Sequence, residues 1–188
     1  MTLKYINYFT SQYKYEVKKI YQNAFPREER FPFWVLKCCA KEKNVRFNVI
    51  LDGGKLVGMV YIIHCENYTY LMFFAIEKSQ RKKGYGSQIL KDLTEQYKNI
   101  ILSIEKPDEK FNDDKAKRKN FYLKNGLQET NKFMKDNGVL YELLCTNKEF
   151  VITEEKLRER YTKMTHSAVM KWIMSKLFNV HRIDFIEE

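Results

Sequence analysis

The chain has 188 residues, of which 44% are hydrophobic and 15% aromatic, and its formal net charge is +10. This length suits one domain with a substantial core, and the apolar content excludes an intrinsically disordered chain. Positive charge is concentrated in residues 78–135, which hold 15 Lys and Arg against eight Asp and Glu. Such a field suits a polyanionic ligand, either a phosphorylated cofactor or a nucleic acid, although a merely soluble basic surface explains it as well.

The four cysteines and three histidines show neither a CxxC pair nor the spacing of a metal site. We therefore expect no bound metal and read the neighbouring Cys38 and Cys39 as buried thiols. Because no signal peptide is visible at the N-terminus, we expect a reducing, cytoplasmic location. No apolar run approaches the roughly 20 residues of a membrane span, so no membrane association is expected.

The first third of the chain alternates helical and extended patterns. Hydrophobic period and turn residues predict, in order, a strand at 4–9, helices at 17–24 and 33–41, and strands at 45–51 and 56–65. The two helices are joined by a charged turn with two prolines, and the two strands by Asp52-Gly53-Gly54, which is typical of a hairpin.

Residues 68–97 join a buried strand, a basic loop and a helix. The strand, residues 68–76, is apolar and rich in aromatic side chains, and the loop at 77–83 carries four cations. After Gly84 and Gly86 the apolar residues take helical spacing, so a helix is expected to start near Ser87. The free N–H groups and positive dipole end of such a helix, approached through glycines, predict an anion site for phosphate.

The glycine spacing excludes two common phosphate ligands. No third glycine follows Gly86 where a dinucleotide site needs one, and no Gly-Lys-Ser/Thr ending provides a nucleoside-triphosphate loop. What remains is Arg81-x-x-Gly84-x-Gly86 directly after a strand. This pattern resembles the coenzyme A pyrophosphate loop of the GNAT superfamily of N-acetyltransferases.

A second motif supports the same resemblance. A basic helix is predicted to run to Asn125 and stop at Gly126, with Phe121 and Tyr122 near its end. This arrangement is similar to the GNAT helix-to-strand motif, with Leu127 in place of the usual Phe. The resemblance implies that Tyr122 protonates the departing coenzyme A thiolate. The alternative is that Tyr122 is a core aromatic residue at a helix end.

The predicted order is strand, two helices, three strands, helix, strand, helix and two strands, which favours an α/β (α+β) fold with helices on both faces of a mixed sheet. The last three of these strands are expected at 99–104, 127–134 and 139–145. The resemblance covers residues 3–146 and implies a mostly antiparallel sheet with one splayed pair of parallel strands at the cofactor site. We expect an acetyltransferase domain at 1–147.

Residues 148–188 are expected to form a C-terminal helical extension. Apolar residues recur at helical spacing across 153–177, with Glu154 and Glu155 in the first turn. We expect one helix that packs on the domain or on a partner protomer, so a homodimer is one option. Such a helix could serve simply to cover the hydrophobic core, or it could close a substrate pocket.

The resemblance also implies a cofactor site. Acetyl-CoA is the expected co-substrate, with its pantetheine arm hydrogen-bonded to the strand backbone at Phe74, Ala75 and Ile76. The pyrophosphate would be held by main-chain N–H groups and cations of the loop, from Arg81, Lys82, Lys83, Gly84, Tyr85, Gly86 and Ser87. Asn112 is a further candidate cofactor contact.

The group that deprotonates the acceptor is left open. Many family members carry a glutamate where this chain has Tyr70, so we expect Glu105, at the end of the next strand, to act as base. Deprotonation through water is the alternative, and a structural ion pair between Glu105 and Arg118 is another. Glu28 or Glu29 would bind a cationic amine, unless they form ion pairs within a solvated turn.

These features predict an N-acetyltransferase that moves an acetyl group from acetyl-CoA to a primary amine by direct attack, through a tetrahedral intermediate. No acetyl-enzyme is expected, because the cysteines have no visible activating base or cation. One alternative is a basic nucleic-acid-binding module, although no recognised motif for one is present. Another is a GNAT-like regulatory protein that binds coenzyme A without turnover. The sequence does not name the acceptor, and a small molecule, a peptide N-terminus or a lysine remain open.

Overall fold

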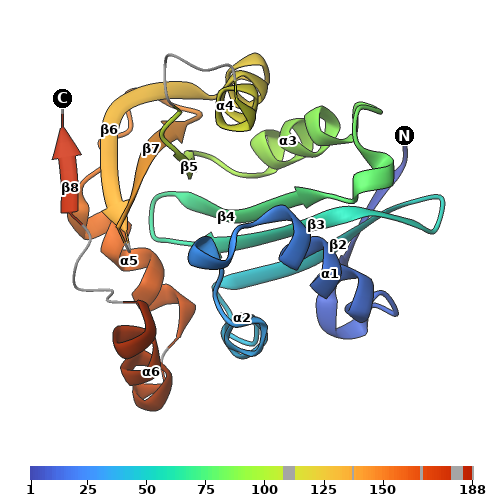
Figure 1. The fold of residues 1–188 in the computed structure, drawn as a ribbon, viewed down its shortest axis with the longest axis horizontal. Coiled ribbons are helices and arrows are strands. Elements are labelled where there is room, and N and C mark those ends of the chain that lie inside the picture. Colours follow the sequence, from blue (N-terminus) through green and yellow to red (C-terminus); the bar gives the residue numbers. More distant parts are fainter. Residues whose placement is uncertain (108–112, 137, 166, 179–183, 188) are drawn as a thin grey trace.

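The computed structural model describes residues 1–107, 113–136, 138–165, 167–178 and 184–187. Within them, a single eight-stranded sheet carries helices on both faces (Figure 1). The strands are Leu3–Asn7 (β1), Val45–Asp52 (β2), Lys55–His64 (β3), Thr69–Ile76 (β4), Ile100–Glu105 (β5), Gln128–Asp136 (β6), Val139–Cys145 (β7) and Asp184–Glu187 (β8). The α-helices are Lys14–Ala24 (α1), Phe33–Cys39 (α2), Tyr85–Gln96 (α3), Asp114–Lys124 (α4), Glu154–Met164 (α5) and Ala168–Phe178 (α6). Short 3-10 helices are Tyr8–Thr10 (η1), Arg27–Glu29 (η2) and Lys78–Gln80 (η3).

The strand order across the sheet is β1-β2-β3-β4-β5-β7-β6-β8. Every neighbouring pair is antiparallel except β4 and β5, which confirms the predicted mixed, mostly antiparallel sheet. The elements from β1 to β7 follow the predicted order, with boundaries shifted by a few residues. The largest shift is at the start of the first helix, which begins at Lys14 where the apolar spacing predicted residue 17, because its first turn is polar.

The two parallel strands pair over a short stretch before they separate. Thr69 pairs with Ile100 and Tyr70 with Ile101, and the rest of β4 and β5 shares no ladder. β4 also holds one extra residue against β3, at Met72, and such a bulge bends a strand and increases its twist. β4 and β5 are therefore the splayed pair of parallel strands that the family resemblance implies, and a gap opens between them beyond Tyr70 and Ile101.

Two apolar cores lie on opposite faces of the sheet. One packs beneath α1, α2, α5 and α6, and the other beneath α3 and α4 (Figure 1). Because side chains alternate between the faces of a strand, neighbouring residues of β4 serve different cores. Tyr70 belongs to the first core and Leu71 to the second.

The C-terminal segment corrects one prediction. Instead of a single helix over residues 153–177, the chain forms α5 and α6, which are interrupted at Thr165 by extended backbone (φ −159°, ψ 139°). The prediction was wrong because the apolar spacing continues across a break that it cannot detect. A strand that the sequence did not indicate, β8, then pairs antiparallel with β6 at the sheet edge. No helix in the described residues combines the length and the apolar character that spanning a bilayer requires.

Leu157 of α5 tests whether the C-terminal segment shares its core with the rest of the chain. The side chain is 0% exposed and packs in the core beneath α1 and α2. We expect Leu157→Ala to lower the free energy of unfolding by about 2–5 kcal/mol, because a buried cavity remains. Urea or thermal unfolding would measure this as a shift of one cooperative transition.

Val169→Ala on α6 is the control, since that side chain is 68% exposed and should change the free energy of unfolding by no more than about 0.5 kcal/mol. An unchanged main transition in the Leu157→Ala protein would show instead that the C-terminal segment folds on its own.

Candidate active site

A cavity of about 860 Å³ occupies the gap between β4 and β5. It is lined from both faces of the sheet, by Tyr70 and Phe73 on the face of α1 and α5 and by Phe74 and Leu102 on the face of α3 and α4. The cavity therefore crosses the sheet. Two ligands that enter from opposite faces can meet where the strands part.

The first turn of α3 forms one end of the cavity. Gly84 precedes the helix with a left-handed φ of +82°, and the first intrahelical bond runs from the Gln88 N–H to the Gly84 carbonyl, at 3.1 Å. The N–H groups of residues 85–87 thus precede the helical ladder and point out of its positive end. The residues of the predicted phosphate loop that line the cavity are Arg81, Lys82, Gly84, Gly86 and Ser87.

Two residues of the predicted loop turn away from the cavity. The Lys83 ammonium donates to Gln80 Oε1 at 3.0 Å, and the Tyr85 hydroxyl donates to the Asp52 carboxylate at 2.9 Å. Neither side chain lines the cavity. Tyr85 can therefore offer a ligand only its main-chain N–H, while Lys83 braces the loop.

Gly86 allows α3 to approach α4 closely. A Cβ atom at this position would lie 2.9 Å from Cζ of Phe121, which is closer than real contacts allow. The Phe121 ring also packs against Phe74 of β4, with 6.5 Å between the ring centroids. The second glycine of the motif is thus needed for the close packing of α3 against α4.

The helix α4 brings Tyr122 and two further cations to the same side. Asp113 caps the start of the helix, and Gly126 follows its end with a φ of +89°. Lys117 and Arg118 line the cavity beside Tyr122. Tyr122 is 8% exposed, and burial raises the pKa of its hydroxyl to about 12, so the phenol keeps its proton at neutral pH.

The predicted base, Glu105, does not line the cavity. Its carboxylate forms an ion pair with Lys115 at 3.1 Å, whereas the structural alternative named Arg118 as the partner. Glu29 does line the cavity, on the face of α1. Glu28 lies in η2, but its side chain is outside the described part of the structure, and Asn112 lies outside the described residues altogether.

The end of the cavity on the face of α1 and α5 is mainly apolar, with a few polar groups. Phe25, Phe31 and Met72 form its apolar wall. Burial raises the pKa of Tyr141, and the negative charges of Glu29, Asp136 and Glu105 raise it further. Of the three, only Glu29 and Asp136 line the cavity.

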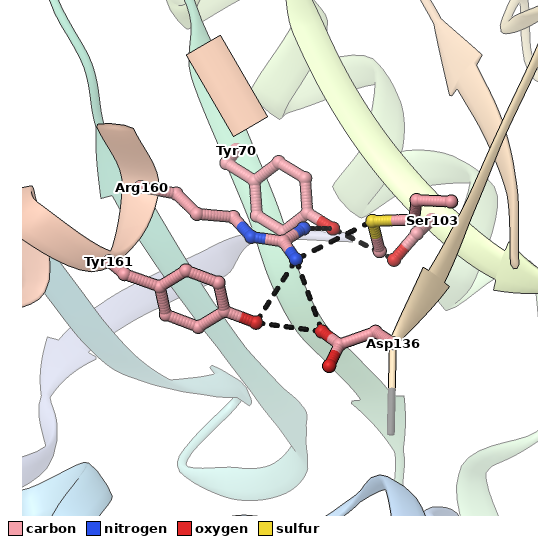
Figure 2. Close-up of polar contacts among 6 residues, drawn as sticks. Tyr70, Ser103, Asp136, Arg160 and Tyr161 are labelled. Atoms are coloured by element: carbon pink, nitrogen blue, oxygen red, sulfur yellow. Dashed lines mark hydrogen bonds and ion pairs between the residues drawn. The ribbon is translucent and has the colours of Figure 1, made fainter. Parts of the chain in front are cut away.

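Arg160 of α5 lies buried in this wall, with 2% of its surface exposed. Its guanidinium lies over the rings of Tyr70 and Tyr161, at 4.6 and 4.7 Å from their centroids. As Figure 2 shows, it donates to the Tyr70 hydroxyl, to the Tyr161 hydroxyl at 3.1 Å and to the Asp136 carboxylate at 3.3 Å. The Tyr161 hydroxyl donates to the same Asp136 oxygen at 2.8 Å, and Ser103 Oγ lies 2.8 Å from the Tyr70 hydroxyl.

The charge of Arg160 persists despite its burial. Burial acts against the cation, but Tyr161, Tyr70 and Asp136 raise its pKa above the usual value. A buried arginine with such partners is a fixed positive centre, and removal of one partner leaves a buried charge uncompensated. The Arg160 cluster consists of Tyr70, Ser103, Asp136, Arg160 and Tyr161.

The Arg160 cluster is not predicted from the sequence. For Arg160 a signal was present, because it follows Leu157 by three residues and so falls on the apolar face of its helix, where a solvated arginine is not expected. Nothing in the sequence marks Asp136 as a site residue, since an aspartate is common at the start of a polar hairpin turn. Tyr70 stands out in the sequence only as the residue at the position where the resemblance implies a glutamate.

Metal ligands and reactive thiols are not found at this site. Among the described residues, no three His, Cys, Asp or Glu side chains gather where they could hold a metal ion. None of the four cysteines lines the cavity. Cys39 is buried as predicted, whereas Cys38 is exposed, so the prediction was wrong for that thiol. Burial raises the pKa of Cys39 to about 12 and the pKa of Cys65 to about 11, so both remain neutral thiols.

A mixed sheet opened between two parallel strands, with a cation-flanked helix start beside the opening, is the architecture of an acyltransferase. The sequence matches the family model for the acetyltransferase (GNAT) family over residues 13–126. The chain therefore belongs to this family. The Arg160 cluster lies partly outside the matched residues, because α5 follows them.

Solved structures share the fold. A Bacteroides thetaiotaomicron protein assigned to the GNAT family is 23% identical, with a TM-score of 0.67 over 91% of this chain and 99% of that chain. The ribosomal-protein-S18-alanine N-acetyltransferase of Escherichia coli is 11% identical, with a TM-score of 0.57 over 81% and 97% of the two chains. An aminoglycoside 6'-N-acetyltransferase complexed with coenzyme A is 14% identical, with a TM-score of 0.61 over 82% and 100%. Comparison with curated protein sequences gave no match.

The contact between Gly86 and Phe121 yields a stability prediction. We expect Gly86→Ala to lower the free energy of unfolding by about 1–3 kcal/mol, because the new methyl group overpacks against the Phe121 ring. Phe121→Leu should relieve this penalty, so the double variant should be more stable than the sum of the single effects predicts. Urea unfolding of the four proteins measures the coupling, and strictly additive effects would contradict the contact.

Proposed function

We propose that the protein is an N-acetyltransferase that moves an acetyl group from acetyl-CoA to a primary amine. The observation that carries this proposal is the cavity that crosses the sheet between β4 and β5, with different chemistry at its two ends. One end holds the start of α3 and four cations, Arg81, Lys82, Lys117 and Arg118. The other end holds carboxylates within a mainly apolar wall.

The cationic end suits the phosphates of coenzyme A. The N–H groups at the start of α3 can bind the pyrophosphate, and the four cations can add charge-assisted hydrogen bonds. The three predicted backbone contacts, Phe74, Ala75 and Ile76, line the cavity and use β3 as their partner on the other edge of β4. A pantetheine arm that lies along the open edge could hydrogen-bond to it as an added strand does.

The chemistry is a direct transfer. The bound ammonium loses a proton to water, and the lone pair of the amine attacks the thioester carbon to give a tetrahedral intermediate. A main-chain N–H of β4 stabilises the oxyanion, because charge develops on that oxygen. When the intermediate collapses, the C–S bond breaks and Tyr122 gives its proton to the thiolate. The second proton of the attacking nitrogen leaves to give the neutral amide, and it restores the proton of Tyr122. The buried, protonated Tyr122 and the lack of a thiol in the cavity support this order of events.

Binding of acetyl-CoA and release of free thiol test the function directly. Acetyl-CoA at 100 times its dissociation constant should raise the free energy of unfolding by about 2.7 kcal/mol, which a thermal melt detects. A panel of primary amines should then include one that releases free coenzyme A thiol. No stabilisation by acetyl-CoA would contradict the proposal, and stabilisation without transfer to any amine would indicate a coenzyme-A-binding protein without turnover.

Tyr122→Phe tests the acid. The ring remains to pack in the core while the proton donor is lost, so we expect kcat to fall by about 100- to 10,000-fold. The Kd for acetyl-CoA should change by less than about threefold, since the hydroxyl acts on the leaving thiolate. Tyr97→Phe is the matched control. Tyr97 is the C-cap residue of α3, at the end of the helix away from Gly84, and it is partly buried but does not line the cavity. Equal kcat in the Tyr122→Phe and wild-type proteins would remove Tyr122 from the mechanism.

A further inference from the structure

We infer that Asp136 binds the ammonium group of the acceptor, and that Arg160 and Tyr161 of α5 hold its carboxylate in position. The inference rests on the proposed N-acetyltransferase function and names the residue through which the cavity recognises its acceptor. It assigns Asp136 as a specificity residue that contacts the acceptor. Arg160 and Tyr161 are positioning residues, because they act through Asp136.

The place of Asp136 in the fold is the first support. It lies at the end of β6 and lines the cavity on the side opposite to α3 and α4. Ser103 stands two residues beyond Ile101, the last residue of β5 that pairs with β4, and it lines the cavity too. The hydrogen bonds of the Arg160 cluster run from Ser103 through Tyr70 and Arg160 to Asp136 (Figure 2). They place the carboxylate beside the point where the sheet opens.

The hydrogen bonds of Asp136 are the second support. Both Tyr161 Oη and Arg160 Nη2 donate to Oδ2, at 2.8 and 3.3 Å. Among the described residues, no donor reaches Oδ1, and the side chain, which lines the cavity, is 20% exposed. An ionised carboxylate accepts several hydrogen bonds, so Oδ1 can accept from an ammonium group in the cavity.

Arg160 lines the cavity, but its guanidinium is already engaged within the cluster. Its two Nη atoms donate within the cluster and to Met134 Sδ, and Tyr70 and Tyr161 cover the guanidinium. Its Nε atom is buried and has no hydrogen-bond partner among the described residues. A carboxylate on the acceptor would therefore meet a guanidinium that Asp136 already pairs, and Asp136 would repel it.

The acceptor class that fits is an alkyl amine without a nearby carboxylate. A primary amine is protonated at neutral pH, so it enters as an ammonium ion that Asp136 can bind. The carbon chain next to the ammonium would lie against Phe25, Phe31 and Met72, which form the apolar wall on this side. An amine with a carboxylate close to the amino group should be a poorer acceptor than an alkyl amine of the same length.

Asp136→Asn is the decisive variant, because it keeps the size of the side chain and removes its charge. With the best acceptor of the amine panel, we expect kcat/KM for the acceptor to fall by about 10- to 100-fold, mainly through KM. The Kd for acetyl-CoA should stay unchanged, and Asp136→Glu should recover part of the loss. Asp184→Asn on β8 is the matched control, since that side chain is exposed at the neighbouring strand.

Variants of α5 test the positioning role. Arg160→Met should raise the acceptor KM, while Arg158→Met, on the same helix but paired with Glu154 at 2.6 Å, should leave it unchanged. Should Arg160→Met fail to fold, Tyr161→Phe serves instead, because it keeps the ring and removes one donor to Asp136. Tyr161→Phe is expected to raise the acceptor KM several-fold without changing the Kd for acetyl-CoA.

The outcomes separate this inference from the proposed function. If the wild-type protein acetylates an amine and Asp136→Asn does so with the same acceptor KM, the assignment of Asp136 is wrong and the enzyme function stands. If the wild-type protein binds no acetyl-CoA and acetylates no amine of the panel, the proposed function and this inference both fall. A preference for 4-aminobutanoate over n-butylamine in the wild-type protein would overturn the acceptor class.

Discussion

The early separation of β4 from β5 is the constraint on which the site depends. Their pairing ends at Tyr70 and Ile101, and the bulge at Met72 bends β4. One edge of β4 therefore faces the cavity instead of another strand. Because side chains alternate between the faces, an opening in the sheet joins two regions that the sheet would otherwise keep apart. The start of α3, Tyr122 and the Arg160 cluster all lie around this opening.

The Arg160 cluster shows how a buried charge can be tolerated in such an opening. Desolvation of a guanidinium is costly unless its donors and its charge are matched, and here two hydroxyls and a carboxylate meet it. The same contacts tie β4, through Tyr70, to β6, through Asp136. This link holds a carboxylate of β6 on the same side of the sheet as Tyr70, the position where the resemblance implies a glutamate in many family members.

The sequence predicted the elements that depend on local pattern, and missed those that depend on distant contacts. The strand, glycine turn and helix at β4 and α3 were predicted because period and turn chemistry change within a few residues. The phosphate loop was predicted for the same reason, although the directions of Lys83 and Tyr85 depend on partners that only the fold brings near. The break before α6 and the strand β8 leave no mark in the apolar spacing. Asp136 and Arg160 are 24 residues apart in sequence and meet only through tertiary packing.

The placement of α5 bears on how the site is assembled during synthesis. The glycine turn before α3, β4, β5 and Tyr122 are all translated by residue 122, whereas Arg160 and Tyr161 emerge later. A nascent chain that has released its first 145 residues holds every strand from β1 to β7, yet the wall beside Asp136 is still missing. Because a domain folds as a unit and α5 shares its core with α1 and α2, the site can reach its final shape only after α5 has left the ribosome. If Asp136 binds the acceptor as we infer, the acceptor side of the site is thus completed by a helix translated after every strand from β1 to β7.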